Sequence, residues 1–249
     1  MNNPYETDEL LHQYLAFHYG REYFGVKNYA VQCAHTALQL MANKPRKRAL
    51  DLGCAVGRST FELARGFDQV VGIDLSARFI EAAQELQSGE TLKYFLRDEG
   101  ELGRTVEARL QDHQLQSLAS KVQFEQGDAC NLPTNISGFD LVFAGNLIDR
   151  VAQPEAFLKD MAQRVVIGGL LIISSPYTLL EEYTPRNQWI GGYTTNGQVR
   201  SVLDGMQAAL APQFRLAQSP LNVPFVIRET ARKFQHSVAE YTVWERLPT

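Results

Sequence analysis

The sequence has few cysteines, no excess of basic residues and no long apolar run. Its cysteines, Cys33, Cys54 and Cys130, are odd in number and form no CxxC pair, which argues against a disulfide framework and a zinc site. With 24 Lys and Arg against 28 Asp and Glu, the net charge of −4 argues against nucleic-acid and acidic-membrane partners. The longest apolar stretch, residues 165–173, is much shorter than the ~18 residues of a membrane-spanning helix.

The N-terminal residues, MNNPYETDELLHQ, contain no basic segment followed by an apolar one, so the sequence predicts no secretory signal. Together with unpaired cysteines, this predicts a cytoplasmic protein without a metal site. A composition of 45% hydrophobic and 21% charged residues is typical of a globular chain with ample material for a core. We expect a single domain over residues 1–249.

Short apolar runs alternate with helical patterns along the chain. The runs that predict strands are Arg48–Gly53, Val70–Asp74, Val122–Gln126, Phe139–Ala144, Leu170–Ser174, Pro224–Arg228 and Glu240–Arg246. Helical patterns begin at Ser76 and span Gln153–Arg164. Because parallel strands need crossover connections, this order predicts an α/β fold with a mostly parallel sheet and helices on both faces. A short polar connection before the last strand predicts an antiparallel hairpin there.

Three segments stand outside this alternation. Residues 1–45 predict an N-terminal helical lid or layer, helical from Thr7 to Ala42 with an aromatic interruption. The charged residues 91–120 predict a surface-facing helical insertion. Residues 174–197 form a second insertion, rich in Tyr, Thr, Gly and Pro. Since ligands of open α/β sheets bind beyond the carboxyl ends of the strands, this second insertion is the expected wall of a ligand site.

The most informative segment is ALDLGCAVGRST, residues 49–60, in which a strand leads through small residues into a helix. It fails the dinucleotide fingerprint, because Ala55 and Arg58 stand where G-x-G-x-x-G needs glycine. Its acid-x-G-x-small-x-G pattern instead resembles class I methyltransferases that use S-adenosylmethionine. Most of that superfamily has glycine where this chain has Ala55, whose methyl group is tolerated if its φ stays negative.

The following strand ends fit the same resemblance. Asp74 offers a carboxylate to both ribose hydroxyls, with a helix cap as the alternative; Asp128 and Ala129 would contact adenine, with a simple turn as the alternative. The resemblance implies that Asp51 orients the turn or the cofactor's amino group, and that Asn146 faces the sulfonium unless it is a structural turn residue. The expected cofactor-binding residues are Asp51, Gly53, Cys54, Ala55, Gly57, Asp74, Leu75, Asp128, Ala129 and Asn146.

A narrower resemblance rests on the segments YLAFHYG (14–20), DLGCAVGRS (51–59), NLIDR (146–150) and SPYTLLEEYTP (175–185). Together they are similar to the methyltransferase module of ovothiol biosynthesis, whose pattern includes Ala55. This resemblance implies transfer of a methyl group from S-adenosylmethionine to an imidazole nitrogen of 5-thiohistidine, also called 4-mercaptohistidine, or of its selenium analogue. Many members are fused to an iron-dependent sulfoxide synthase, so a separate synthase is the expected functional partner here.

Methyl transfer is an in-line displacement that needs mainly alignment and exclusion of water. An imidazole acceptor calls for side chains that orient its ring, and its amino-acid end calls for a cation and an acid. Candidates are His18, Tyr19, Tyr177 and Tyr193 for the ring, Glu181, Glu182 or Asp149 for ring N–H or ammonium, and Arg150 or Arg186 for the carboxylate. The expected catalytic set is His18, Tyr19, Asn146, Tyr177, Glu181 and Tyr193, with at most one of the neighbouring glutamates facing the acceptor.

Two other interpretations remain open from the sequence. One is a methyltransferase for another small polar acceptor, and the other is a non-catalytic subunit that binds S-adenosylmethionine. A nucleic-acid methyltransferase would depend on the basic run KPRKR at residues 44–48, which we interpret as a solvated turn.

Overall fold

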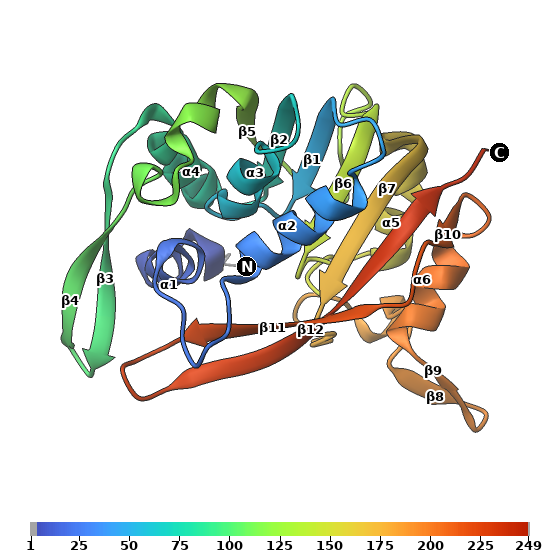
Figure 1. Ribbon diagram of the computed structural model, residues 1–249. Coiled ribbons are helices and arrows are strands. Elements are labelled where there is room, and N and C mark those ends of the chain that lie inside the picture. Colours follow the sequence, from blue (N-terminus) through green and yellow to red (C-terminus); the bar gives the residue numbers. More distant parts are fainter. Residues whose placement is uncertain (1–3, 249) are drawn as a thin grey trace.

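The computed structural model describes residues 4–248, and within them a central sheet has eight strands in the order β10-β12-β7-β6-β1-β2-β5, with β11 paired to β12 (Figure 1). Its strands are β1 (Arg48–Leu52), β2 (Gln69–Asp74), β5 (Val122–Gln126), β6 (Phe139–Gly145), β7 (Val165–Ser175), β10 (Phe214–Leu216), β11 (Leu221–Arg228) and β12 (Phe234–Arg246). Strands β1, β2, β5, β6 and β7 run parallel, whereas β12 runs antiparallel to β7 and pairs with β11 as a hairpin. The predicted mostly parallel sheet with an antiparallel C-terminal strand is confirmed.

Helices cover both faces of the sheet, as the alternation of apolar runs predicts. They are α1 (Asp8–Tyr19), α2 (Tyr29–Leu40), α3 (Arg58–Leu63), α4 (Ala77–Ser88), α5 (Pro154–Arg164) and α6 (Val202–Leu210), with short 3-10 turns at Pro4–Glu6, Gln111–His113, Gln116–Lys121 and Arg186–Gln188. Successive strand side chains point to opposite faces. Leu141 and Phe143 therefore pack with α1 to α4, whereas Val142 and Ala144 pack with α5 and α6.

The helical prediction for residues 91–120 is wrong. The chain there forms an antiparallel hairpin, β3 (Leu92–Glu99) and β4 (Leu102–Ala108), followed by two 3-10 turns. Along β3 the buried Tyr94 and Leu96 alternate with exposed neighbours, which is the two-residue period of a strand. The density of charged residues concealed that alternation in the sequence. Arg228 of β11 donates to Asp98 Oδ1 at 2.6 Å and ties the hairpin to the main sheet.

The other local predictions are largely confirmed. Helices α1 and α2 fill most of Thr7–Ala42, and Ser76 caps α4 by accepting from Phe79 N. The sequence analysis missed α6, β10 and a small hairpin, β8 (Tyr193–Thr195) with β9 (Gln198–Arg200), inside and after the second insertion. Residues 1–3 of the expected N-terminal layer lie outside the described residues.

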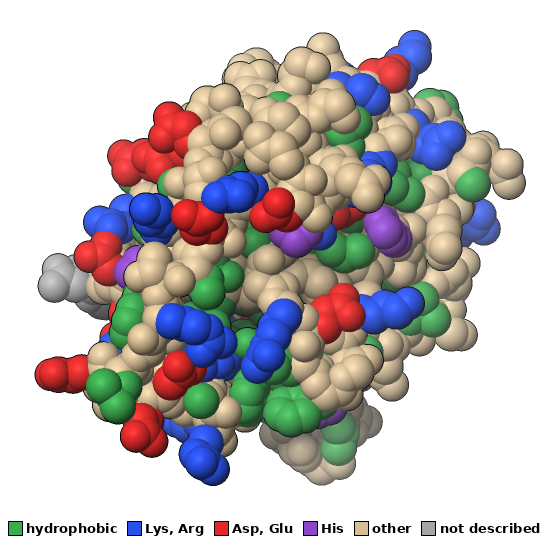
Figure 2. Space-filling model, turned by 60° about the vertical axis from the view of Figure 1, so that its left-hand side comes forward, with side chains coloured by type: hydrophobic (Ala, Val, Ile, Leu, Met, Phe, Trp, Pro, Cys, Tyr) green, Lys and Arg blue, Asp and Glu red, His purple; other side chains and the backbone are tan. Residues whose placement is uncertain are grey.

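The surface carries no large area of a single charge on the face seen in Figure 2, where acidic and basic side chains are interspersed. A groove that follows a nucleic-acid backbone needs a continuous basic surface. Among residues 4–248, no helix is both long and apolar enough to cross a membrane.

Candidate active site

The turn after β1 is held against β2. Gly53 N and Cys54 N both donate to the Ile73 carbonyl, at 2.8 and 3.2 Å. Gly57 has a φ of +84°, and a Cβ there would lie 2.6 Å from the Phe124 ring, so only glycine fits. Ala55 has a φ of +48°, so the condition that its φ stays negative is not met.

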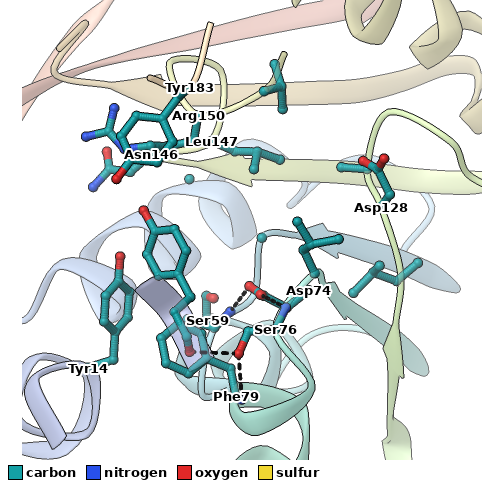
Figure 3. A pocket seen from close by; sticks show the side chains of 18 of the residues that line it. Tyr14, Ser59, Asp74, Ser76, Phe79, Asp128, Asn146, Leu147, Arg150 and Tyr183 are labelled. Atoms are coloured by element: carbon teal, nitrogen blue, oxygen red, sulfur yellow. Dashed lines mark hydrogen bonds between the residues drawn. The ribbon is translucent and has the colours of Figure 1, made fainter. Parts of the chain in front are cut away.

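Ala55 takes this strained conformation because its N–H points at the end of β2. It donates to Asp74 Oδ2 at 2.8 Å, and Ser76 N donates to Asp74 Oδ1 at 2.9 Å (Figure 3). Burial raises the pKa of Asp74, and these backbone donors offset the rise only in part, so the pKa stays above its ordinary value. Each carboxylate oxygen keeps a second lone pair, so Asp74 is oriented by the turn and still able to accept ligand hydroxyls. The cap of α4 is Ser76 and not Asp74.

Asp51 lies behind the turn and is buried. Its Oδ2 accepts from Ser59 Oγ at 2.6 Å and from Thr60 Oγ1 at 2.7 Å, which joins β1 to the first turn of α3. Burial raises its pKa from 3.8 to about 6, and the two hydroxyl bonds oppose that rise. Asp51 is not among the residues that line the cavity, so its contacts in the structure orient the turn.

A cavity of about 380 Å³ opens above the carboxyl ends of the parallel strands, where open α/β sheets bind ligands. One end is lined by Leu75, Gly127, Asp128 and Ala129. Asp128 Oδ1 accepts from Cys130 N at 2.8 Å, which fixes the carboxylate at this rim. Figure 3 shows Asp128 far from Tyr14 and Asn146, which lie toward the opposite end with Asp74 between them. We refer to these as the Asp128 end and the Asn146 end.

The N-terminal layer covers the Asn146 end. Tyr14, Phe17 and His18 of α1 line it, and the first 3-10 turn is anchored on α4, because Glu6 accepts from Ala77 N at 3.0 Å. His18 is only 7% exposed; burial, aided by the nearby charge of Arg58, lowers its pKa to about 3. Its ring is therefore neutral at physiological pH, and its Nδ1 has no partner among the described residues.

Arg150 and Glu182 bring opposite charges to the lining of the cavity, and Figure 3 shows Arg150 beside Asn146. Arg150 donates from Nη1 to Asp149 Oδ2 at 3.1 Å and to the Thr178 carbonyl at 3.0 Å, and it stacks over the Tyr183 ring. Asp149 also accepts from Thr178 N at 3.0 Å. Asp149 is fully buried and does not line the cavity, so its contacts hold Arg150 and the second insertion together.

The structure brings some of the predicted residues together and separates others. Those that line the cavity are His18, Gly53, Ala55, Asp74, Leu75, Asp128, Ala129, Asn146, Arg150 and Glu182. Those that do not are Tyr19, Asp51, Cys54, Gly57, Asp149, Tyr177, Glu181, Arg186 and Tyr193. Tyr19 donates to the Val56 carbonyl at 2.8 Å and Tyr177 to Glu240 at 2.7 Å, whereas Arg186 stacks on Tyr193 elsewhere.

Several aromatic residues of the cavity were not predicted as site residues. They are Tyr5, Tyr14, Phe17, Tyr29, Phe79, Phe143 and Tyr183. For Tyr14 a signal existed, because it lies four residues before His18 in a predicted helix and so shares its face. No such signal exists for Tyr29 and Tyr183, because only the fold brings them next to the other residues of the cavity.

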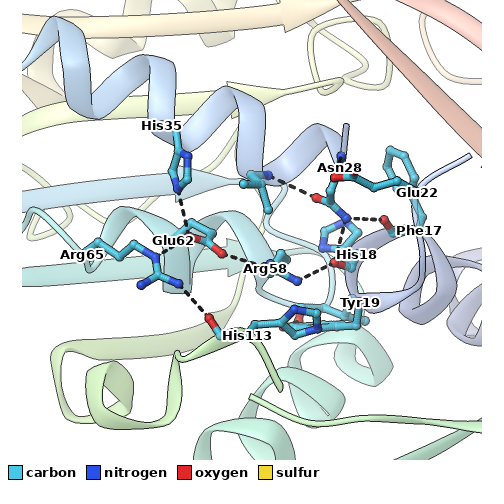
Figure 4. A network of polar contacts seen from close by, with 12 residues as sticks. Phe17, His18, Tyr19, Glu22, Asn28, His35, Arg58, Glu62, Arg65 and His113 are labelled. Carbon is cyan, nitrogen blue, oxygen red and sulfur yellow. Dashed lines mark hydrogen bonds and ion pairs between the residues drawn. The ribbon is translucent and has the colours of Figure 1, made fainter. Parts of the chain in front are cut away.

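A buried polar network joins α1 to α3 (Figure 4). Arg58 pairs with Glu62 at 3.0 Å, and Glu62 also accepts from Arg65 at 2.6 Å. Although burial raises the pKa of Glu62, the hydrogen bonds and charges of Arg65 and Arg58 lower it overall. Arg58 Nη1 donates to the His18 carbonyl at 3.1 Å, which fixes the end of α1 on α3.

Comparison with known proteins agrees with this geometry. Residues 50–173 match the family model described as a methyltransferase domain. Ajmaline N-methyltransferase of Rauvolfia serpentina is 29% identical over 133 residues, which are 53% of this chain and 36% of that protein. Phosphoethanolamine N-methyltransferase 1 of Arabidopsis thaliana is 26% identical over 152 residues, covering 59% of this chain and 25% of that protein. The matched region thus spans about a third or less of these relatives.

Solved structures share the fold. Magnesium protoporphyrin IX methyltransferase from Synechocystis PCC 6803 superposes with a TM-score of 0.57 at 15% identity, over 97% of this chain and 96% of that one. The methyltransferase domain of bacterial-CtHen1-C gives 0.55 at 18% identity, over 89% and 100%. The fold and the turn-centred site define the class I methyltransferase type. Residues 50–173 form a methyltransferase domain of this type. The Synechocystis enzyme of the same fold was solved with bound S-adenosylhomocysteine, the product form of S-adenosylmethionine.

Proposed function

We propose that this protein transfers a methyl group from S-adenosylmethionine to an imidazole nitrogen of 5-thiohistidine. The observation that carries the proposal is that one cavity is lined by two opposite charges, Arg150 and Glu182, together with Asn146 and the neutral ring of His18. An amino-acid acceptor needs a cation for its carboxylate and an acid for its ammonium, and both are present. The aromatic side chains around them suit a flat ring. The relatives named as N-methyltransferases support a nitrogen atom of a small molecule as the methyl acceptor.

The residues present fit the cofactor. Asp74 is oriented by two backbone donors with lone pairs left for the ribose hydroxyls, and Asp128, at the other end of the cavity, would offer its carboxylate to the adenine amino group. Gly53 has a φ of +71° and no side chain, so the backbone of the turn can approach the methionine part closely. Bound S-adenosylmethionine supplies an electrophilic methyl group at its sulfonium.

The chain itself contributes positioning and exclusion of water. Tyr14, Phe17 and His18 of α1 cover the Asn146 end, which keeps the reacting centre dry. His18 stays neutral, so it offers an acceptor ring one N–H and one lone pair without repelling the sulfonium. Arg150, held by Asp149, keeps Nε and Nη2 for a ligand carboxylate, since its described hydrogen bonds all use Nη1.

We assign residues 1–249 to one methyltransferase domain that acts in the cytoplasm on a small amino acid. A separate sulfoxide synthase would supply the thiohistidine, because methyl transfer inserts no sulfur. The selenium analogue of the acceptor is compatible with the same cavity, since the two differ by one chalcogen atom.

The test is a mass-spectrometric assay of purified protein with S-adenosylmethionine and 5-thiohistidine, with histidine and selenohistidine as competing acceptors. We expect 5-thiohistidine to gain the mass of one methylene group, and NMR of the product to place the methyl group on the ring. Cofactor binding without methylation of these acceptors would refute the proposed substrate. Transfer to another small polar molecule would then identify the enzyme's acceptor, and no transfer to any acceptor would favour a non-catalytic subunit.

A further inference from the structure

Tyr29, the first residue of α2, is buried but lines the Asn146 end of the cavity. Its ring lies between aromatic neighbours, 6.0 Å from the Phe17 ring and 4.9 Å from the Phe225 ring by centroids. Its hydroxyl lies 2.7 Å from Asn146 Oδ1 and 2.7 Å from Ser174 Oγ. The ring is thus fixed by packing. The hydroxyl meets Asn146 and Ser174 at the ends of β6 and β7, and it also lies against the buried Cys33 thiol of α2.

The direction of these hydrogen bonds follows from proton counting. A tyrosine hydroxyl has a single proton, and Tyr29 donates it to Asn146 Oδ1. Ser174 must therefore donate its own hydroxyl proton to Tyr29. Burial raises the pKa of Tyr29 well above its ordinary value, so this hydroxyl keeps its proton throughout the physiological range.

Asn146 is held by its backbone as well as by its side chain. Its N–H donates to the Ser174 carbonyl at 2.7 Å, and its φ is +52°. The amide oxygen is turned to Tyr29, whereas Nδ2 has no partner among the described residues and is not enclosed. The N–H donors are therefore the part of the amide that remains for a molecule in the cavity.

We propose that Tyr29 is a positioning residue, which fixes the amide of Asn146 so that its N–H donors face the methyl acceptor. This inference rests on the proposed function in placing the acceptor at the Asn146 end. Without the Tyr29 hydroxyl, the amide can turn over and present its oxygen instead. Tyr29 then selects for an acceptor that offers a lone pair or a negative charge to Asn146, and against one that offers only N–H groups.

The first test removes the hydroxyl alone, in Tyr29→Phe. We expect kcat/KM for the methyl acceptor to fall about tenfold, which is the effect of one misdirected hydrogen bond, while the affinity for S-adenosylmethionine stays unchanged. The matched control is Tyr241→Phe, which removes a buried hydroxyl that donates to the Cys33 carbonyl of α2 and does not line the cavity. Equal losses of acceptor turnover in both variants would overturn the proposal.

A double-mutant cycle tests whether Tyr29 acts through Asn146. If it does, Tyr29→Phe has little further effect once Asn146→Ala has removed the amide, so the two losses are not additive. Additive losses would mean that Tyr29 acts independently of Asn146, and would refute the inference. Melting temperatures of all variants separate this coupling from a general loss of stability.

A measurement without turnover keeps this inference separate from the proposed function. In the complex with S-adenosylhomocysteine, the side-chain amide protons of Asn146 are expected to give one sharp NMR pair. Tyr29→Phe should broaden or shift that pair, and Tyr241→Phe should not. An unchanged Asn146 pair in Tyr29→Phe overturns the inference, even if thiohistidine is methylated. A changed pair supports it even if thiohistidine proves not to be the substrate.

Discussion

Arg58, at the start of α3, donates from Nη1 to the backbone carbonyl of His18, 3.1 Å away at the end of α1. The guanidinium is buried, pairs with Glu62, and lies 5.5 Å from the centroid of the Tyr19 ring. One buried cation therefore connects the helix that follows the glycine turn with the helix that covers the Asn146 end. The position of α1 over the cavity depends on this connection.

Arg58→Met should destabilise the protein strongly. It leaves the buried Glu62 with Arg65 and the ring of His35 as its remaining partners and releases the His18 carbonyl, so we expect a loss of about 3 kcal/mol in the free energy of unfolding. Urea denaturation measures it. As a control, Lys159→Met breaks the exposed pair with Glu155 and should cost less than about 0.5 kcal/mol. Similar losses for the two variants would contradict the role assigned to Arg58.

Ala55→Gly should stabilise the protein, because Ala55 holds a φ of +48° that glycine adopts without strain. We expect a gain of up to about 1 kcal/mol in thermal or urea unfolding. The opposite change two residues on, Gly57→Ala, places a Cβ 2.6 Å from the Phe124 ring and should cost more than about 2 kcal/mol. A loss of stability in Ala55→Gly would show that the turn is not strained at this position.

Asp74→Asn should weaken binding of S-adenosylmethionine about tenfold or more. The amide removes one acceptor oxygen from the ribose site and places a donor opposite the Ala55 or Ser76 N–H. Isothermal titration calorimetry gives the affinity, and the exposed Asp68→Asn serves as a control of equal charge change. If both variants bind the cofactor like the wild type, the ribose role of Asp74 is wrong.

Glu182→Gln and its neighbour Glu181→Gln form a natural pair, since Glu182 lines the cavity and Glu181 does not. Loss of the Glu182 charge should raise KM for the proposed amino-acid acceptor about tenfold while leaving cofactor affinity unchanged. Glu181→Gln should leave both constants near their wild-type values. Steady-state kinetics with each substrate varied in turn measures both constants. An effect confined to Glu181→Gln would mean that Glu181, and not Glu182, contacts the acceptor.

Asp51 should make a characteristic contribution to the pH dependence of stability. Burial raises its pKa from 3.8 to about 6. Between these pH values Asp51 is therefore protonated in a larger fraction of folded molecules than of unfolded ones. The stability that Asp51 contributes is therefore greatest below about pH 4 and declines as the pH rises to about 6. Relative to Asp51→Asn, the wild type should lose about 3 kcal/mol over this interval. Urea unfolding at several pH values measures the difference, which would be flat if Asp51 did not titrate there.

The sequence by itself determined the parallel sheet and the turn after β1. Local patterns suffice for these features: the apolar runs predict the parallel strands, Ser76 predicts the start of α4, and the small residues 53–57 predict a turn, all without reference to distant segments. The positions of Asp74 and Asp128 at strand ends follow for the same reason, because parallel strands bring their carboxyl ends to one edge. The hairpin β3–β4 was missed although its signal is local, since charged residues masked the alternation of Tyr94 and Leu96.

Only the tertiary structure decided which polar side chains share the cavity. Glu181 and Glu182 are chemically identical in the sequence, and the path of the second insertion places one of them at the site. The positive φ of Ala55 follows from a hydrogen bond to Asp74 across two strands, and the orientation of Asn146 from a hydroxyl on α2. Such contacts join residues that lie in different segments, so they depend on how β1 and β2 pair and on how α2 and the second insertion pack over the sheet. No local pattern encodes that packing.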